Sequence, residues 1–99
     1  MGRKATVTAP GPLSLKISEM VRAAIDNSPH GQNAVAEAAR VSSGQLSEVL
    51  TGKKQFTIGQ LDRVCFVLDI PLRELIKNAD EATRDRYITM DIEALASSS

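Results

Sequence analysis

The sequence predicts an all-α domain of five short helices around one core. Apolar residues recur at helical spacing in five successive segments, and each segment is bounded by glycine, proline or a capping residue. The 42% apolar content comes mostly from Ala, Val, Leu and Ile, while aromatic residues make up only 3%, which favours a helical core over a β-sandwich or barrel. A length of 99 residues suits one domain with a modest core.

We expect three parts along the chain. Residues 1–13 contain prolines and glycines and are expected to form a flexible arm. Residues 14–78 hold the five helices. Residues 79–99 form a C-terminal extension whose conformation the pattern leaves open: Ile88, Ile92 and Leu95 fit one face of a helix, and Ile88, Met90 and Ile92 fit a strand equally well.

The first helix is expected to begin at Ser14, whose hydroxyl can cap the free amides of a helix N-terminus. Its apolar stripe consists of Ile17, Met20, Val21, Ala24 and Ile25. The helix should end within residues 27–31, because the Pro29 and Gly31 in that segment oppose helix continuation.

Two short helices joined by a tight turn are expected next. The second helix runs from Gln32 to Ala39, and its buried side carries Val35, Ala36 and Ala39. Residues 40–42 make the turn, and Ser42 then opens a Ser-x-x-Gln capping box. The third helix is expected to bury Leu46, Val49 and Leu50 and to end at Thr51-Gly52.

The last two helices follow a basic loop, residues 53–56. Thr57 opens a second capping box, Thr-x-x-Gln. The predicted stripe of the fourth helix is Ile58, Leu61, Val64, Cys65 and Leu68. Residues 69–71 break that helix, and Pro71 suits the first turn of a fifth helix that carries Leu72, Leu75 and Ile76.

Several classes of function are excluded by what the sequence lacks. It has no catalytic-triad pattern, no glycine-rich phosphate loop and no metal-ligand cluster, so we expect no enzyme, no cofactor, no metal site and no small-molecule ligand. The single cysteine, Cys65, cannot form an internal disulfide and is expected to be a buried core thiol. A lone thiol fits a cytoplasmic protein, and no apolar run is long enough to span a membrane.

The formal net charge is zero, but the charge is unevenly distributed. Residues 1–78 carry ten Lys or Arg against seven Asp or Glu, which gives +3, while residues 79–99 carry two against five, which gives −3. A mildly basic body with an acidic tail is compatible with a nucleic-acid partner for the body alone.

Residues 31–76 resemble the Cro and phage-repressor family of helix-turn-helix domains, also called the XRE family. The match is ungapped, and it includes Gln32, Val35-Ala36-Glu37, Val41-Ser42, Leu46-Ser47, Gly52-Lys53 and the apolar ladder from Ile58 to Leu75. The resemblance implies a lambda-repressor-like fold. It also implies a sequence-specific regulator that binds double-stranded DNA, most commonly a repressor of phage or mobile-element type.

Base reading falls, by this resemblance, to the N-terminal half of the third helix, which would enter the major groove. The candidates are Ser42, Ser43, Gly44, Gln45, Ser47 and Glu48. Glu48 is the strongest base-directed partner, because its carboxylate can accept a hydrogen bond from a cytosine amino group. The plainer interpretation of Glu48 is a solvated helix residue.

Phosphate contacts are assigned to other positions. Gln32 begins a helix, where free amides and the helix dipole favour an anion. Lys53 and Lys54 follow the third helix, and Arg3 and Lys4 are candidates for contacts from the arm. The alternative is that the arm is disordered and makes no contact with DNA.

Three positions depart from the family pattern. Arg40 stands where the family usually has glycine, so either Arg40 adopts the glycine geometry or the turn differs. Leu50 replaces a glutamate that pairs with an arginine of the first helix, and an apolar contact with Ile25 would replace that pair. The third helix carries no Lys or Arg, which weakens nonspecific attraction to DNA.

The alternatives are an antitoxin that autoregulates its operon, and a protein-interaction module that kept the fold without DNA binding. Regulators of this fold usually bind DNA as homodimers. Residues 80–95 are the candidate dimer segment, packed on the twin as a helix or added to it as a strand. The alternative is that this segment folds back on its own core.

Overall fold

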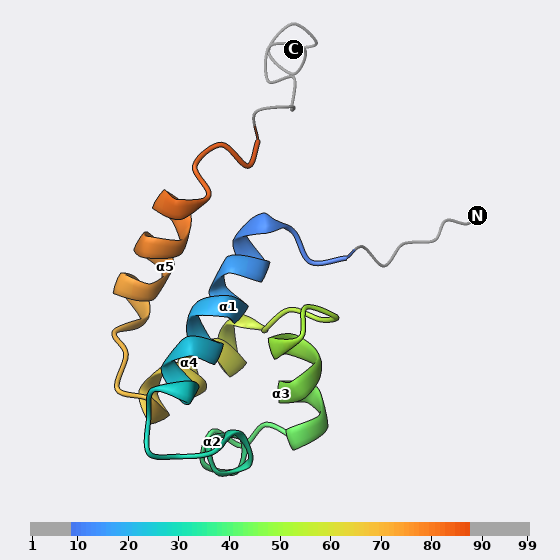
Figure 1. Cartoon of the computed structure of the whole chain (residues 1–99), viewed down its shortest axis with the longest axis vertical. Coiled ribbons are helices and arrows are strands. Elements are labelled where there is room, and N and C mark those ends of the chain that lie inside the picture. The colour runs from blue at the N-terminus through green and yellow to red at the C-terminus, as the bar shows by residue number, and fades with distance from the viewer. Residues whose placement is uncertain (1–8, 88–99) are drawn as a thin grey trace, which may run out of the picture.

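The computed structural model describes residues 9–87, and within that range the chain forms helices and no strands. The helices are α1 (Pro12–Asp26), α2 (Gln32–Ala38), α3 (Ser43–Leu50), α4 (Ile58–Val67) and α5 (Leu72–Ala82). The predicted all-α class with five helices is therefore confirmed (Figure 1). No helix among residues 9–87 combines the length and the apolar run needed to cross a bilayer.

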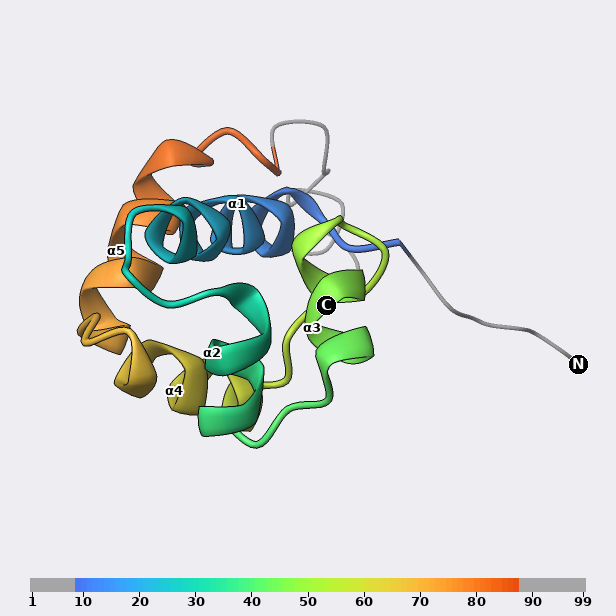
Figure 2. The ribbon, with the colours of Figure 1, turned by 60° about the horizontal axis from the view of Figure 1, so that its bottom comes forward.

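The helices pack as a ring around one core. In order of contact the ring is α1, α3, α2, α4 and α5, and α5 closes it by lying along α1 (Figure 2). Each helix sends a fully buried side chain inward, and all five have 0% exposure: Val21, Val35, Leu46, Val64 and Ala79. The apolar stripes predicted from helical spacing thus meet in one place, and burial of each Leu or Val stabilises the fold by roughly 1.5–3 kcal/mol.

The N-cap of helix α1 lies three residues earlier than predicted. Pro12 occupies its first turn and Gly11 is the N-cap, so the predicted cap at Ser14 is wrong. Proline suits this position because its ring fixes φ near the helical value and its missing N–H has no partner there to lose. The Ser14 hydroxyl instead donates to Oε1 of Gln55 at 2.7 Å, which ties α1 to the loop before α4.

The two predicted capping boxes differ in completeness. At α4 the box is complete: Gln60 N–H donates to Thr57 Oγ1 at 3.1 Å, and Thr57 N–H donates to Gln60 Oε1 at 3.0 Å. At α3 the Ser42 hydroxyl accepts from the amide of Gln45 at 3.1 Å, and the return bond is not formed among the described residues. Pro71 is the N-cap of α5 rather than part of its first turn.

Helices α2, α3 and α4 all end in a Schellman motif. The residue after each C-cap has a positive φ: 60° at Arg40, 84° at Gly52 and 59° at Asp69. At the end of α2, the backbone amide of Val41 donates to the Ala36 carbonyl at 2.9 Å, and the backbone amide of Arg40 donates to the Glu37 carbonyl at 3.1 Å. Arg40 therefore adopts the left-handed geometry itself, which resolves the first departure from the family pattern.

Two apolar residues of α4 lie in solvent. Ile58, which the stripe placed on the buried face, is 74% exposed, so that assignment is wrong. Ile58 is the first residue of the helix, between exposed Thr57 and Gly59, and the helix begins beyond the edge of the core. Phe66 is 85% exposed and lies off the stripe formed by Leu61, Val64 and Cys65.

Helix α5 continues past the expected boundary at residue 78. It runs to Ala82, and Ala79 is completely buried, so the division between body and extension falls inside the helix.

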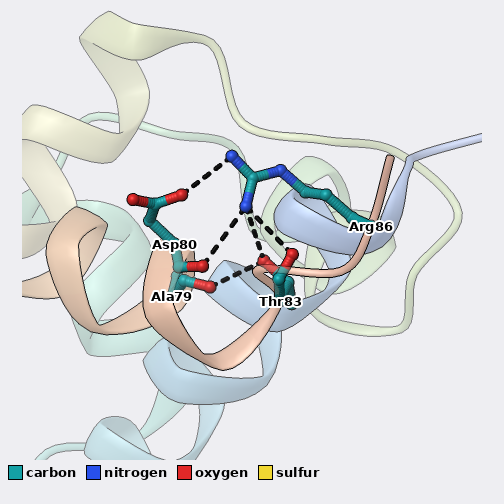
Figure 3. A network of polar contacts seen from close by, with 4 residues as sticks. All are labelled: Ala79, Asp80, Thr83 and Arg86. Atoms are coloured by element: carbon teal, nitrogen blue, oxygen red, sulfur yellow. Dashed lines mark hydrogen bonds and ion pairs between the residues drawn. The ribbon is translucent and has the colours of Figure 1, made fainter. Parts of the chain in front are cut away.

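A polar network then fixes residues 83–87 (Figure 3). Arg86 Nη2 lies 2.8 Å from Asp80 Oδ1, and its Nη1 donates to the backbone carbonyl of Thr83 at 3.0 Å. Residues 88–95 of the proposed dimer segment lie outside the described residues.

Candidate nucleic-acid interface

Helices α2 and α3 form a helix-turn-helix unit held by small and apolar side chains. Val35 and Ala36 of α2 are 0% and 1% exposed, and Leu46 of α3 is 0% exposed, all within one buried cluster. Val41 in the turn is 7% exposed and extends the same cluster. Figure 2 shows that α3 stands at the outer side of the ring, so one of its faces is free of other helices.

An arginine outside the helix-turn-helix unit holds the turn in place. Nε of Arg63, on α4, donates to the carbonyl oxygen of Ala39 at 2.8 Å, at the C-terminal end of α2. A cation there satisfies a free carbonyl and opposes the negative end of the helix dipole. The contact joins residues 24 apart, and no local pattern marks it.

The presence of Leu50 where the family has a glutamate also has a structural account. Ile25 and Leu50 are 5% and 6% exposed and belong to the same apolar cluster. Hydrocarbon at both positions avoids the desolvation cost of a buried ion pair.

The outward face of α3 is short, polar and mostly uncharged. Ser42, Ser43, Gly44 and Ser47 are exposed, whereas Gln45 and Glu48 are half-buried. The Ser42 oxygen already accepts the Gln45 amide, but the hydroxyl keeps a proton to donate. Five of the six predicted base-reading residues thus lie in α3 and the sixth, Ser42, is its N-cap; four of the six are open to solvent.

Gly44 leaves open space on this face. No heavy atom lies within 4 Å of the position that a Cβ on Gly44 would occupy, and its φ is not in the left-handed region. Gly44 lies in the first turn of α3, and glycine is a poorer helix former than alanine by up to about 1 kcal/mol in a helix interior. Neither the backbone nor the packing of the described residues requires that cost.

Glu48, a predicted base-reading residue, forms an ion pair with Lys54, a predicted phosphate contact. Nζ of Lys54 lies 3.1 Å from Oε1 of Glu48, and both side chains are about half exposed, at 58% and 45%. The backbone makes this pairing possible, because the amides of Lys53 and Lys54 both donate to the Glu48 carbonyl, at 2.9 and 3.2 Å. The chain after α3 therefore folds back over Glu48. Lys53 is exposed and forms no ion pair among residues 9–87.

The remaining predicted phosphate contacts are only partly described. Gln32 is the first residue of α2 and is half-buried, and the N-cap before it, Gly31, has no side chain to satisfy the free amides. Arg3 and Lys4 lie outside the described residues.

The chain is similar in structure to a known regulator. No protein-family model matches the sequence, and no curated protein matches it. Two crystal structures of the clp gene regulator ClgR from Corynebacterium glutamicum do match. One is 27% identical, with a TM-score of 0.63, covering 71% of this chain and 91% of that one. The other is 23% identical, with a TM-score of 0.66, covering 89% and 93%. The likeness extends over almost the whole ClgR chain and is not confined to the α2–α3 unit.

Proposed function

We propose that this protein is a sequence-specific regulator of transcription that binds double-stranded DNA through α3. The observation that carries the proposal is the exposed face of Ser43, Gly44 and Ser47 on a helix anchored by fully buried Leu46. A major groove admits one α-helix, and hydroxyl groups and a carboxylate on that helix can bond to base edges. The similarity to ClgR, a gene regulator by name, supports the same class of function.

The open space at Gly44 is compatible with a partner against this face. The protein bears the cost of glycine inside α3 although its own packing leaves the space empty. A glycine is useful where another molecule approaches the backbone closely. We infer that the space at Gly44 is filled by the edge of a base or the wall of the groove.

In this proposal the other residues divide into two roles. Glu48 reads a base, while Gln32, Lys53 and Lys54 hold phosphates. Lys54 begins in an ion pair with Glu48, which is worth about 0–1 kcal/mol at such an exposed position, so a phosphate can replace the carboxylate at little cost. The finer description, a repressor of phage or mobile-element type that acts as a homodimer, comes from the family resemblance and remains part of the proposal.

One observation favours the rival function, a protein-interaction module. Helix α3 carries no Lys or Arg, and the one carboxylate on it neutralises Lys54. Such a surface attracts phosphates weakly. The decisive experiment selects bound sites from random duplexes and then titrates the best site at two salt concentrations. A DNA-binding function requires an enriched motif and an affinity that falls steeply with salt.

A pair of glycine variants tests the role of α3 itself. Gly44 and Gly59 both occupy the second position of a helix, in α3 and α4, and both have room for a Cβ. Gly44→Ala and Gly59→Ala should each leave the melting temperature equal or higher. Only Gly44→Ala should weaken binding to the selected duplex. Equal affinity for the two variants would remove α3 from the interface and favour the interaction module.

A further inference from the structure

The outer surface where α2 meets α4 contains a hollow that the proposed DNA interface does not use. It has a volume of about 290 Å³, and we call it the Phe66 hollow; its lining is Ala38, Arg40, Asp62, Arg63, Phe66 and Val67. Phe66 is 85% exposed, more than any other large apolar side chain among residues 9–87. Aromatic side chains contribute much of the binding energy of an interface when they are covered, so Phe66 could anchor a partner seated in this hollow.

The rim of the hollow is positively charged and partly preorganised. Arg63 is fixed by its bond to the Ala39 carbonyl, which leaves its other guanidinium N–H groups free to donate. Arg40 is held in the left-handed conformation at the end of α2. Neither arginine forms an ion pair within residues 9–87, and Asp62 is the only carboxylate in the lining. The hollow therefore suits apolar side chains accompanied by carboxylates.

The sequence itself contains a segment of this composition. Residues 88–99 carry four large apolar side chains, two carboxylates and no Lys or Arg: Ile88, Met90, Ile92 and Leu95, with Asp91 and Glu93. Apolar residues interspersed with carboxylates complement an exposed ring between two arginines in polarity and charge. No other stretch outside the described residues is acidic, since residues 1–8 carry Arg3 and Lys4.

We propose that residues 88–99 dock into the Phe66 hollow of a second copy of this chain, so that two copies exchange their C-terminal segments. The exchange is reciprocal and closes as a two-fold dimer. The direction of α5 favours exchange over a return to the same chain, because α5 leads away from α4 and ends beside the start of α1 (Figure 1). The Arg86 network fixes residues 83–87 beyond that point. A segment of twelve residues can span up to roughly 40 Å, which is enough to reach a neighbouring molecule.

This inference rests on the homodimer in the proposed function but not on its DNA binding. The first test measures the mass of the full chain in solution by sedimentation across a range of concentrations. We expect a dimer whose dissociation constant rises at least tenfold in Phe66→Ala and in Ile92→Asp. Ile58→Ala is the matched control, since Ile58 is similarly exposed on the same helix and lies outside the hollow, and it should leave the constant unchanged. Equal dimerisation of Phe66→Ala and Ile58→Ala would overturn the proposal.

Cross-linking identifies the occupant. Ala38→Cys lies in the lining and Met90→Cys in the segment, while the natural Cys65 is buried. When the two single variants are mixed and treated with a short thiol cross-linker, exchange predicts a covalent heterodimer. A double variant that cross-links within one chain, with no heterodimer in the mixture, would show that the segment covers its own hollow. A monomeric full chain with no cross-link would leave the hollow to a different protein, and either result refutes the exchange. Binding to the selected duplex is measured separately, so a failure of the DNA function remains distinguishable.

Discussion

The left-handed backbone at Arg40 allows a direct test of how α2 is terminated. Arg40 has φ of 60° at the end of a Schellman motif, a conformation that crowds the Cβ of any L-residue. Replacement by glycine removes the Cβ and leaves both backbone hydrogen bonds in place, from Val41 to Ala36 and from Arg40 to Glu37. Arg40→Gly should therefore stabilise the fold.

Two opposing contributions set the size of the effect. Relief of the left-handed strain is worth roughly 1–2 kcal/mol. The greater conformational freedom of glycine in the unfolded chain offsets about 0.5–1 kcal/mol of that stabilisation. The net gain is about 0.5–1 kcal/mol, which for a domain near 100 residues corresponds to a rise in melting temperature of roughly 2–6 °C.

Thermal unfolding followed by circular dichroism measures this rise, and two variants control it. Arg40→Ala removes the long side chain but keeps the Cβ, so its melting temperature should stay near that of the parent. Asp69→Gly makes the same change at the end of α4, where φ is 59°. Its gain should be smaller, because aspartate tolerates the left-handed region better than most residues. If Arg40→Gly melts at or below the temperature of Arg40→Ala, strain at this position is not what limits stability.

Four further predictions concern the core and the proposed interface. Leu46→Ala should cost about 2–5 kcal/mol, because Leu46 is completely buried where α3 meets the core, and chemical denaturation measures the loss. A loss below 1 kcal/mol would contradict the packing of α3 described above. Replacing both Lys53 and Lys54 by Ala should weaken binding to all duplexes alike and flatten the salt dependence by about one to two units of slope. Glu48→Ala should instead change the preference at one base pair by about 1–3 kcal/mol, which sequence selection on both proteins detects. Burial raises the pKa of the Cys65 thiol, and the nearby charge of Asp62 raises it further. The thiol of the native protein should therefore react with a thiol reagent only at the rate at which local or global unfolding exposes it. Rapid labelling without denaturant would place Cys65 outside the core.

Features that depend on local chemistry could be predicted from the sequence. The caps at Ser42 and Thr57 and the end of the third helix at Thr51-Gly52 each follow from a few neighbouring residues, and all three are present. Helical spacing also identified most buried positions, because a residue three or four places along a helix returns to the same face. The errors at helix starts, Ser14 and Pro71, arose where a proline lay near the expected start and took a different position from the one predicted.

Features that depend on where the core ends, or on distant contacts, could not be predicted. Periodicity assigned Ile58 to the buried face, but it does not report that the core stops short of the first turn of α4. The bond from Arg63 to Ala39 and the hollow beside exposed Phe66 require α2 and α4 to be in contact, which no local pattern encodes. The pairing of Lys54 with Glu48 depends on the reversal of the chain at Gly52. The assignment of individual side chains to bases and phosphates remains a prediction.

The ion pair between Glu48 and Lys54 bears on how such a regulator would search a genome. A protein that neutralises one of its own cations forms fewer lasting contacts with random duplex, so it would leave incorrect sites quickly and sample more of them in a given time. At the correct site, a cytosine amino group would take the Glu48 carboxylate and release Lys54 to a phosphate. Recognition of the base would then add a contact between Lys54 and a phosphate. The dissociation rate would therefore differ between correct and incorrect sites more than the association rate.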